Sequence, residues 1–387
     1  MTNEVLVRLA RRCLESYEDL IDGWAEQVMA MEPYAQGLVS RAEVLEGARV
    51  GFELILRHLA EGRVPPELRP HSERLGERRA GQGVPLESLL AAARLDARAL
   101  WQGLVRLAAP EDLPPLLEGA ILVWEAVEQH NTGLMTGYQR AVLEMGRQRE
   151  DERRTWFARL LDNDGRNPDV VRDAGRVLGF DVAAAFVAVV ASPAAGAALR
   201  VAAGGMSGLG LRTHRHESPS GDMLVVQLPH RAPDPERLVL DALARVACGV
   251  SPRVNGLARV PHAVRLAAAT IRAGGAAPAG PMRLEDRWLE VFVAHSPELA
   301  AELAERVLGP LGSIGAAERE RLLETVRVHL AGDGAIAETA AALYCHRNTV
   351  QHRFARFREL TGRDVRVPGD AAVVALALRV RPADEGG

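Results

Sequence analysis

The sequence predicts a multidomain protein of mixed α and α/β class, with three parts in series along its 387 residues. We expect a helical bundle over residues 1–150, an α/β domain over residues 151–280, and a linker with a C-terminal helix-turn-helix domain over residues 281–387. Three observations predict this order. Apolar residues recur at helical spacing in the first part, helix and strand patterns alternate in the second, and two short helices flank a tight turn in the third.

The first 150 residues are expected to be helical throughout, because apolar residues recur three and four positions apart. Turn signals separate the apolar runs, at Pro33, Pro65-Pro66, 81–85 and 110–115. We therefore expect four helices packed as a bundle. The last helix should be long, because no proline occurs between Pro115 and Pro168.

A seven-residue repeat of mostly apolar side chains runs along this expected long helix. Its members are Leu117, Ile121, Trp124, Asn131, Met135, Tyr138, Val142 and Met145. Such spacing predicts a seam between two helices. The charged run that follows, at 147–154, is interpreted as a solvated helical connector.

Helix and strand patterns alternate in the middle part, which predicts an α/β domain. Helices are expected at 155–161, 170–178 and 235–246, and strands at 182–191, 199–202 and 223–228. A segment rich in Gly, Ala and Pro, at 273–281, predicts a linker. Beyond it the chain should be helical.

Composition excludes several classes of enzyme. All 47 basic residues are arginines, and without lysine the chain lacks the amine for Schiff-base chemistry, the P-loop lysine and the kinase strand lysine. The net charge of -4 means that nucleic acid would have to be bound through a local basic patch. Three cysteines without CxxC spacing are typical of a reducing compartment, so we expect a cytoplasmic protein with no membrane association. We also expect no secretory signal, because charged residues at 4, 8, 11 and 12 interrupt any apolar start.

The C-terminal part contains the most specific functional signal. A helix expected at 319–330 is followed by an Ala-rich helix at 336–343, a break at 344–346 and a further helix at 347–360. Small residues in the first helix of the pair allow the second to cross it closely, as a helix-turn-helix requires. At 100° per residue, Val350, Phe354 and Phe357 share one face and are expected to pack on the Ala-rich helix.

The opposite face of the helix at 347–360 carries side chains that can read DNA. Four arginines and no acid lie between residues 344 and 358, a local excess that phosphate neutralisation requires. Asn and Gln can bind adenine, and Arg can bind guanine. The candidates are Arg347 and Asn348 for base contacts, Thr349, Gln351 and His352 for bases or backbone, and Thr339, Arg353 and Arg356 for phosphates.

These residues also resemble a known family. The stretch that carries the resemblance comprises Thr339-Ala340, His346-Arg347-Asn348-Thr349-Val350, Arg353-Phe354, Leu360-Thr361-Gly362 and 375–379. It is similar to the C-terminal helix-turn-helix of the PucR family of bacterial transcriptional regulators. The resemblance adds His346 to the DNA-binding candidates, and it implies that Arg347 to Thr349 open the recognition helix and meet double-stranded DNA.

Weaker resemblances extend upstream. The segment 82–101 is similar to the N-terminal helical sensor domain of RsbR-type stressosome proteins, and the middle part resembles the degenerate GGDEF-like domain of these regulators through 178–180, 221–224 and 249–252. A diguanylate cyclase needs two glycines and adjacent acids to hold nucleotide and magnesium. Because Ser220 and Met223 replace the first glycine and the second acid, we expect no catalytic site, no metal and no cofactor.

Histidines in the middle part are candidate metal ligands by residue type. His214 and His216 flank Arg215, with His230 or His262 as further candidates. No Cys or acid completes a convincing set, so exposed loop histidines are the favoured interpretation.

Taken together, the sequence predicts a DNA-binding transcriptional regulator that is not an enzyme. A small-molecule or protein effector would act on the upstream domains, and the protein would work as a homodimer or higher homo-oligomer. One alternative is a signalling scaffold that acts through protein partners, as in stressosome assemblies. A less favoured alternative is a nucleotide-turnover enzyme of the diguanylate cyclase type.

Overall fold

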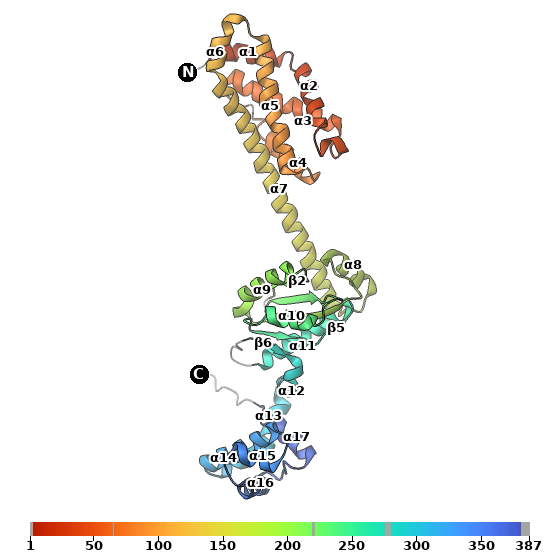
Figure 1. Ribbon diagram of the computed structural model, residues 1–387, viewed down its shortest axis with the longest axis vertical. Coiled ribbons are helices and arrows are strands. Elements are labelled where there is room, and N and C mark those ends of the chain that lie inside the picture. Colours follow the sequence, from red (N-terminus) through yellow and green to blue (C-terminus); the bar gives the residue numbers. More distant parts are fainter. Residues whose placement is uncertain (1–2, 65, 219–220, 275–279, 381–387) are drawn as a thin grey trace. The chain divides into compact units, whose positions relative to one another are not determined.

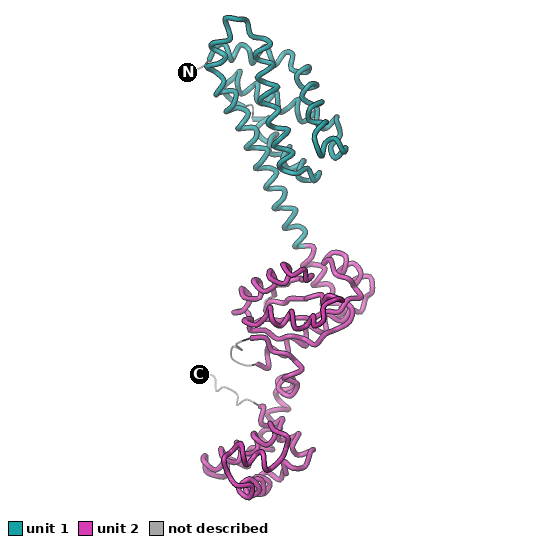
Figure 2. The backbone as a smooth tube through the Cα atoms, viewed as in Figure 1, with its two compact units in different colours: residues 1–151 teal, residues 152–387 magenta. Residues whose placement is uncertain are grey.

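The computed structural model describes residues 3–64, 66–218, 221–274 and 280–380. The chain forms two compact units, residues 1–151 and residues 152–387, which Figure 2 shows in different colours. The second unit includes both the sheet and the C-terminal helices, so the division into three domains stays a prediction. Within the described ranges, no helix has the length and apolar character needed to cross a membrane.

The first unit is built from helices, as predicted, but their number differs from the expected four. They are α1 (Glu4–Leu14), α2 (Glu18–Met29), α3 (Arg41–Glu61), α4 (His71–Gly81), α5 (Leu86–Leu107), α6 (Leu113–Glu118) and the first part of α7 (Ala120–Asp162) (Figure 1). Helix α4 has almost no apolar periodicity, because most of its residues are charged or glycine. Turn signals at Pro65-Pro66 and 81–85 bracket this segment, but without apolar spacing the sequence does not predict a helix between them.

Local signals fix where these helices begin and end. Asn3 caps α1, and its side-chain oxygen accepts a hydrogen bond from the backbone N–H of Leu6 at 3.0 Å. Ser40 and Glu43 form a reciprocal capping box at the start of α3. That helix ends at Gly62, whose φ of 68° lies in the left-handed region that favours glycine.

Helices α4 and α7 approach each other so closely that only glycine fits at the contact. A Cβ atom at Gly76 would lie 2.0 Å from the carbonyl oxygen of Leu134, and a Cβ atom at Gly137 would lie 1.9 Å from that of Glu73. Both distances are far below van der Waals contact. The two helices therefore pack backbone to backbone, which brings Ser72 Oγ within 2.8 Å of His130 Nδ1.

The two faces of α7 have different surroundings. One face is buried in the first unit through Val123, Ala126, Val127, His130 and Leu134. Half of the predicted seam lies on another face, where Ile121, Trp124, Met135 and Val142 are 59%, 60%, 37% and 45% exposed. Two predicted members do not belong to that face, because Leu117 lies on α6 and Tyr138 packs against the core and donates to the carbonyl oxygen of Val84 at 2.8 Å. The first unit alone therefore leaves most of this apolar stripe uncovered.

The second unit contains a sheet in the order β2-β3-β1-β4-β6, with β5 paired to β1. The strands are β1 (Ala185–Ala191), β2 (Arg212–His216), β3 (Met223–Gln227), β4 (Cys248–Val250), β5 (Val254–Asn255) and β6 (Pro281–Arg283). β1 runs antiparallel to β3, β4 and β5, with Val187 opposite Val226, whereas β4 and β6 are parallel. The connection β1-α9-β2-β3-α10-β4 is the ferredoxin-like arrangement.

Helices cover both faces of this sheet (Figure 1). They are α8 (Pro168–Leu178), α9 (Gly196–Gly208), α10 (Pro235–Ala242) and α11 (Val260–Ala273), together with the end of α7. On one face, Val187 and Val189 share a core with residues of α9 and α10. On the other face, Phe186 and Val190 share a core with residues of α7, α8 and α11. This double cover explains why every residue of β1 is buried.

Several sequence predictions change in this region. The expected strand at 199–202 is wrong, because Leu199, Ala203 and Met206 are buried at helical spacing within α9 while Val201 is 77% exposed. The helix expected at 155–161 is the end of α7, and the strand expected from 182 begins at Ala185. Most of the predicted linker at 273–281 lies outside the described residues, which omit 275–279.

The expectation of exposed loop histidines is also wrong for His214. This residue lies on β2, is 3% exposed, and its ring packs on Phe157 with centroids 4.8 Å apart. Burial, reinforced by the charge of Arg153, lowers its pKa to about 3. Among the residues that the structure describes, no group of three or more His, Cys, Asp or Glu side chains is placed to hold a metal ion.

The C-terminal segment is helical, as predicted. It comprises α12 (Trp288–His295), α13 (Pro297–Leu308), α14 (Ala316–Ala331), α15 (Ile336–Ala342), α16 (Arg347–Thr361) and α17 (Pro368–Ala377). Val350, Phe354 and Phe357 are buried in one core with Ala340 of α15, which confirms the predicted face of α16. Residues of α13, α14 and α17 complete this core, and they include Val307, Leu322, Val326 and Val374.

Candidate functional site

The turn between α15 and α16 leaves the N-terminus of α16 at the surface. It is a tight turn, in which the N–H of Cys345 donates to the carbonyl oxygen of Ala340 at 3.0 Å. His346 caps α16, and its Nδ1 accepts a hydrogen bond from the N–H of Asn348 at 3.2 Å. The first turn of α16 contains no acidic residue, so nothing in that turn offsets the positive end of the helix dipole. Such helix ends attract phosphate.

Four predicted DNA-contacting side chains share the exposed face of α16. Arg347, Asn348, Gln351 and His352 are all exposed, and the small side chain of Ala355 lies among them. Thr349 is half-buried at the edge of this face. Arg347 forms no ion pair with any residue that the structure describes, so its charge is free to meet a phosphate or a guanine.

Thr339 does not fit the phosphate contact predicted for it. Its side chain is 4% exposed, and its hydroxyl donates to the carbonyl oxygen of Ala335 at 2.9 Å. The same oxygen lies 3.0 Å from Nδ1 of His329. Because the single hydroxyl proton is already given to Ala335, Nδ1 of His329 must be the donor in that second bond. Thr339 therefore joins α14 to α15 in the interior instead of facing DNA.

The two predicted phosphate-binding arginines are engaged within the protein. Arg353 donates from NH1 to Oγ1 of the buried Thr325 on α14 at 3.0 Å. Arg356 lies between two acids, with Nε 3.2 Å from Glu318 and NH1 2.8 Å from Glu359. These carboxylates raise the pKa of Arg356. A phosphate would have to compete with Glu318 and Glu359 for Arg356, so its contact with DNA stays a prediction.

Tyr344 is a feature of the site that sequence analysis did not single out as a contact. It lies in the turn, its side chain is 99% exposed, and its φ of 51° is in the left-handed region. That conformation is uncommon for a residue other than glycine. The sequence signal for Tyr344 is a bulky aromatic residue in a turn where glycine is common, which could have marked it as a candidate contact.

Comparison with known proteins identifies both ends of the chain. Residues 322–380 match the PucR C-terminal helix-turn-helix domain, and residues 18–153 match the RsbT co-antagonist protein rsbRD N-terminal domain. The transcriptional activator PmfR of Paenarthrobacter nicotinovorans is 35% identical over 91 residues, 24% of this chain and 19% of PmfR. The purine catabolism regulatory protein of Bacillus subtilis is 41% identical over 64 residues, 16% of this chain and 12% of that protein.

These relatives are therefore matched over less than a fifth of their own length. Among solved structures, a regulator of polyketide synthase expression from Bifidobacterium adolescentis aligns with 59% of this chain and 96% of its own, at 22% identity and a TM-score of 0.33. The chain thus carries a PucR-type helix-turn-helix domain at its C-terminal end and an RsbRD-type N-terminal domain upstream.

Proposed function

We propose that this chain is a cytoplasmic regulator that binds specific double-stranded DNA through α16 under control of a signal received by its upstream domains. One observation carries the proposal: the exposed face of α16 groups Arg347, Asn348, Gln351 and His352 at a helix end without acids. The match to the PucR helix-turn-helix domain and the printed names of the curated relatives support it.

The mechanism follows from the placement of these side chains. In a helix-turn-helix, the second helix enters the major groove with its N-terminal residues against base edges. Arg347 then meets guanine and Asn348 meets adenine, because both side chains can form paired hydrogen bonds with those bases. His346 and Thr349 lie at the start of α16 within reach of the backbone, and Ala355 leaves room for the helix to approach the groove.

The test uses the full chain and DNA that flanks its own gene, together with a pool of random duplexes. We expect one sequence to be enriched from the pool, and we expect its affinity to fall steeply between 50 and 200 mM salt as phosphate contacts are screened. Fluorescence anisotropy measures both. Failure to enrich any sequence, with no binding at low salt, would overturn the proposal.

The proposed regulator is a homodimer that pairs through α7. The exposed residues Ile121, Trp124, Met135 and Val142 fall on positions of one seven-residue repeat, and the first unit does not cover them. A monomer would leave these large apolar side chains in water on both sides of the polar residues Glu128 and Asn131. Pairing through α7 would also supply the two-fold symmetry with which helix-turn-helix dimers read two half-sites.

Replacing Ile121 with glutamate should convert the dimer to monomers at micromolar concentration, because it places like charges opposite each other in the seam. The matched control is Leu143→Glu, since Leu143 is 63% exposed on the same helix but lies off the stripe. Sedimentation velocity should show monomer for the first variant and dimer for the second. The same dimer content in both variants would exclude this seam.

We propose that the middle domain is a degenerate GGDEF-like module without cyclase activity. The ferredoxin-like connection and the position of 221–222 in the turn before β3 support this assignment. Asp222 is engaged by Arg215, whose NH1 lies 3.3 Å from its Oδ2, and Met223 stands where a second acid is needed. Both features leave magnesium without its usual pair of carboxylates.

A further inference from the structure

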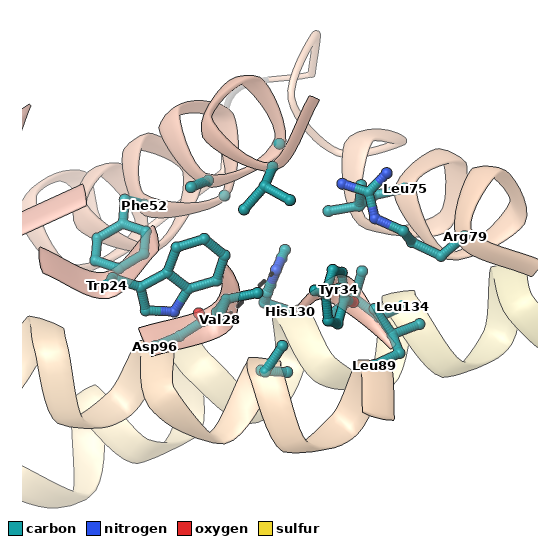
Figure 3. Close-up of a pocket in the computed structure, with 16 residues that line it drawn as sticks. Trp24, Val28, Tyr34, Phe52, Leu75, Arg79, Leu89, Asp96, His130 and Leu134 are labelled. Atoms are coloured by element: carbon teal, nitrogen blue, oxygen red, sulfur yellow. Dashed lines mark ion pairs between the residues drawn. The ribbon is translucent and has the colours of Figure 1, made fainter. Parts of the chain in front are cut away.

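A small cavity in the first unit is lined in part by polar side chains whose hydrogen bonds and charge the surrounding core does not fully pair. Its volume is about 40 Å³, and it lies among α2, α3, α4, α5, α7 and the turn that holds Tyr34 (Figure 3). Trp24, Val28, Phe52, Leu89 and Leu134 supply apolar walls, whereas Arg79, Asp96 and His130 are polar. Polar groups are costly in such a core unless they are paired or used.

Two of the lining groups have unmet hydrogen-bonding capacity. Asp96 is 5% exposed, and its Oδ1 has no hydrogen-bond partner among the described residues. The indole N–H of Trp24, which is 8% exposed, forms no well-aligned hydrogen bond there, although it lies close enough to the Asp96 carboxyl to lower that group's pKa. Figure 3 shows Trp24 beside Asp96, with the ring of His130 between Trp24 and Tyr34. If the Asp96 carboxyl is protonated, a ligand with two acceptor atoms could accept one hydrogen bond from it and one from the Trp24 N–H.

Asp96 does carry that proton near neutral pH. Burial raises the pKa of its carboxyl to about 8, and burial lowers the pKa of His130 to about 4. Both groups are therefore mainly uncharged at pH 7, although Nε2 of His130 lies 3.9 Å from Oδ2 of Asp96. The other titratable groups near the pair are His71 and Arg79 on α4 and Tyr34, none of which is negatively charged at this pH. The nearest group with a negative charge on Arg79's side is Glu43 of α3, whose carboxylate acts on Arg79 beyond ion-pairing distance.

Arg79 brings a positive charge to the cavity wall without a carboxylate in contact, and the Glu43 carboxylate, which accepts a hydrogen bond from Gln82, offsets that charge only from a distance. Its side chain is buried, its NH1 donates to Oε1 of Gln82 at 2.8 Å, and its NH2 donates to the backbone oxygen of Glu43 at 3.2 Å. Both acceptors are uncharged, and no carboxylate of a described residue lies within ion-pairing distance of Arg79. A buried guanidinium without an acid is unfavourable, and a bound anion would correct it.

Cavity volume limits the size of that anion. A water molecule needs roughly 10–15 Å³ of such cavity volume, so the cavity has room for about three water-sized groups. A carboxylate with one or two carbons has three or four non-hydrogen atoms and matches this space. Gly47 and Gly51 of α3 keep it open, because a Cβ atom at Gly51 would lie 3.4 Å from the His130 ring.

We propose that this cavity binds one small monocarboxylate of formate or acetate size, with its oxygens on the Asp96 hydroxyl and the Trp24 N–H and its charge balanced by Arg79. Its use as the controlling signal rests on the proposed function, but the binding itself does not. Both the ligand and its site lie within the first unit.

The experiment is a calorimetric and ¹³C NMR titration of the full chain with acetate at constant ionic strength and without DNA. We expect one acetate per chain at pH 7, and we expect at least tenfold weaker binding of acetamide, which has the same shape without the charge. Gly51→Ala should weaken acetate binding at least tenfold by narrowing the cavity. The matched control is Gly23→Ala on α2, where a Cβ atom would meet nothing within 4 Å and binding should be unchanged.

Two further variants separate the roles of charge and proton. Arg79→Gln should abolish acetate binding while keeping hydrogen-bonding capacity at that position. Wild-type affinity should fall as the pH rises above about 8, because ionised Asp96 repels the carboxylate, whereas Asp96→Asn should bind acetate equally at pH 7 and pH 9. Absence of acetate binding, equal binding of acetamide, or wild-type affinity in Gly51→Ala would overturn the proposal. Acetate binding without any DNA binding would sustain the site and refute the proposed function.

Discussion

Replacing Asn348 with alanine should lower affinity for the preferred DNA sequence by about 1–3 kcal/mol, a factor of about 5 to 150, by removing one paired contact with adenine. Affinity for unrelated DNA should change little, because Asn348 carries no charge. Its side chain is exposed on α16, so the folded domain should tolerate the change. Anisotropy titrations against the preferred duplex, single-base variants and random DNA would measure the effect.

Arg356→Ala is the informative comparison for Asn348→Ala. Loss of this charge should weaken binding to specific and unrelated DNA alike and flatten the dependence on salt by about one unit. Because Glu318 and Glu359 hold the guanidinium, the substitution also leaves two acids unpaired near the site. If Asn348→Ala and Arg356→Ala had equal effects on both kinds of DNA, the division between base and phosphate contacts would be wrong.

Replacing Gly137 with alanine should destabilise the first unit by at least about 3 kcal/mol, at the upper end of the cost of overpacking. The added methyl group would lie 1.9 Å from the backbone oxygen of Glu73, and neither backbone can move without separating α4 from α7. Urea unfolding followed by circular dichroism, with hydrogen exchange of α4, would detect the loss.

Gly146→Ala provides the matched control on the same helix. A Cβ atom at Gly146 would meet nothing within 4 Å, so the higher helix propensity of alanine should stabilise α7 by up to about 1 kcal/mol. The two substitutions are chemically identical and should act in opposite directions. A shared direction would mean that α4 and α7 do not touch at Gly137.

Elements with a strong local pattern could be predicted from the sequence. The presence of a long helix follows from the gap between Pro115 and Pro168, although the sequence did not predict that α7 continues through 155–161. The pair α15 and α16 follows from the Ala-rich segment, the short break after it and the closing Gly362. Helices α4 and α9 could not be assigned in the same way. α4 is held by backbone contacts at Gly76, and α9 presents a short apolar run that fits strand and helix equally.

The exposed face of α16 and the cavity of the first unit also differ in how far local sequence determines them. The exposed face of α16 is encoded within six residues, from Arg347 to His352, so helical spacing alone could assemble it. Thr339 was misjudged because its burial depends on α14, which packs on it from another part of the sequence. Asp96 and His130 lie on different helices of the first unit, and only tertiary packing brings them to one cavity.

The contacts of α14 decide where a DNA-reading fragment can be cut from the chain. The family match begins at residue 322, inside α14, and a fragment starting there would lose Glu318, the partner of Arg356. It would also lose Val307 and Leu311, which are buried in the same core as Phe354. An excised domain meant for crystallisation or fusion should therefore begin no later than Pro297, at the start of α13.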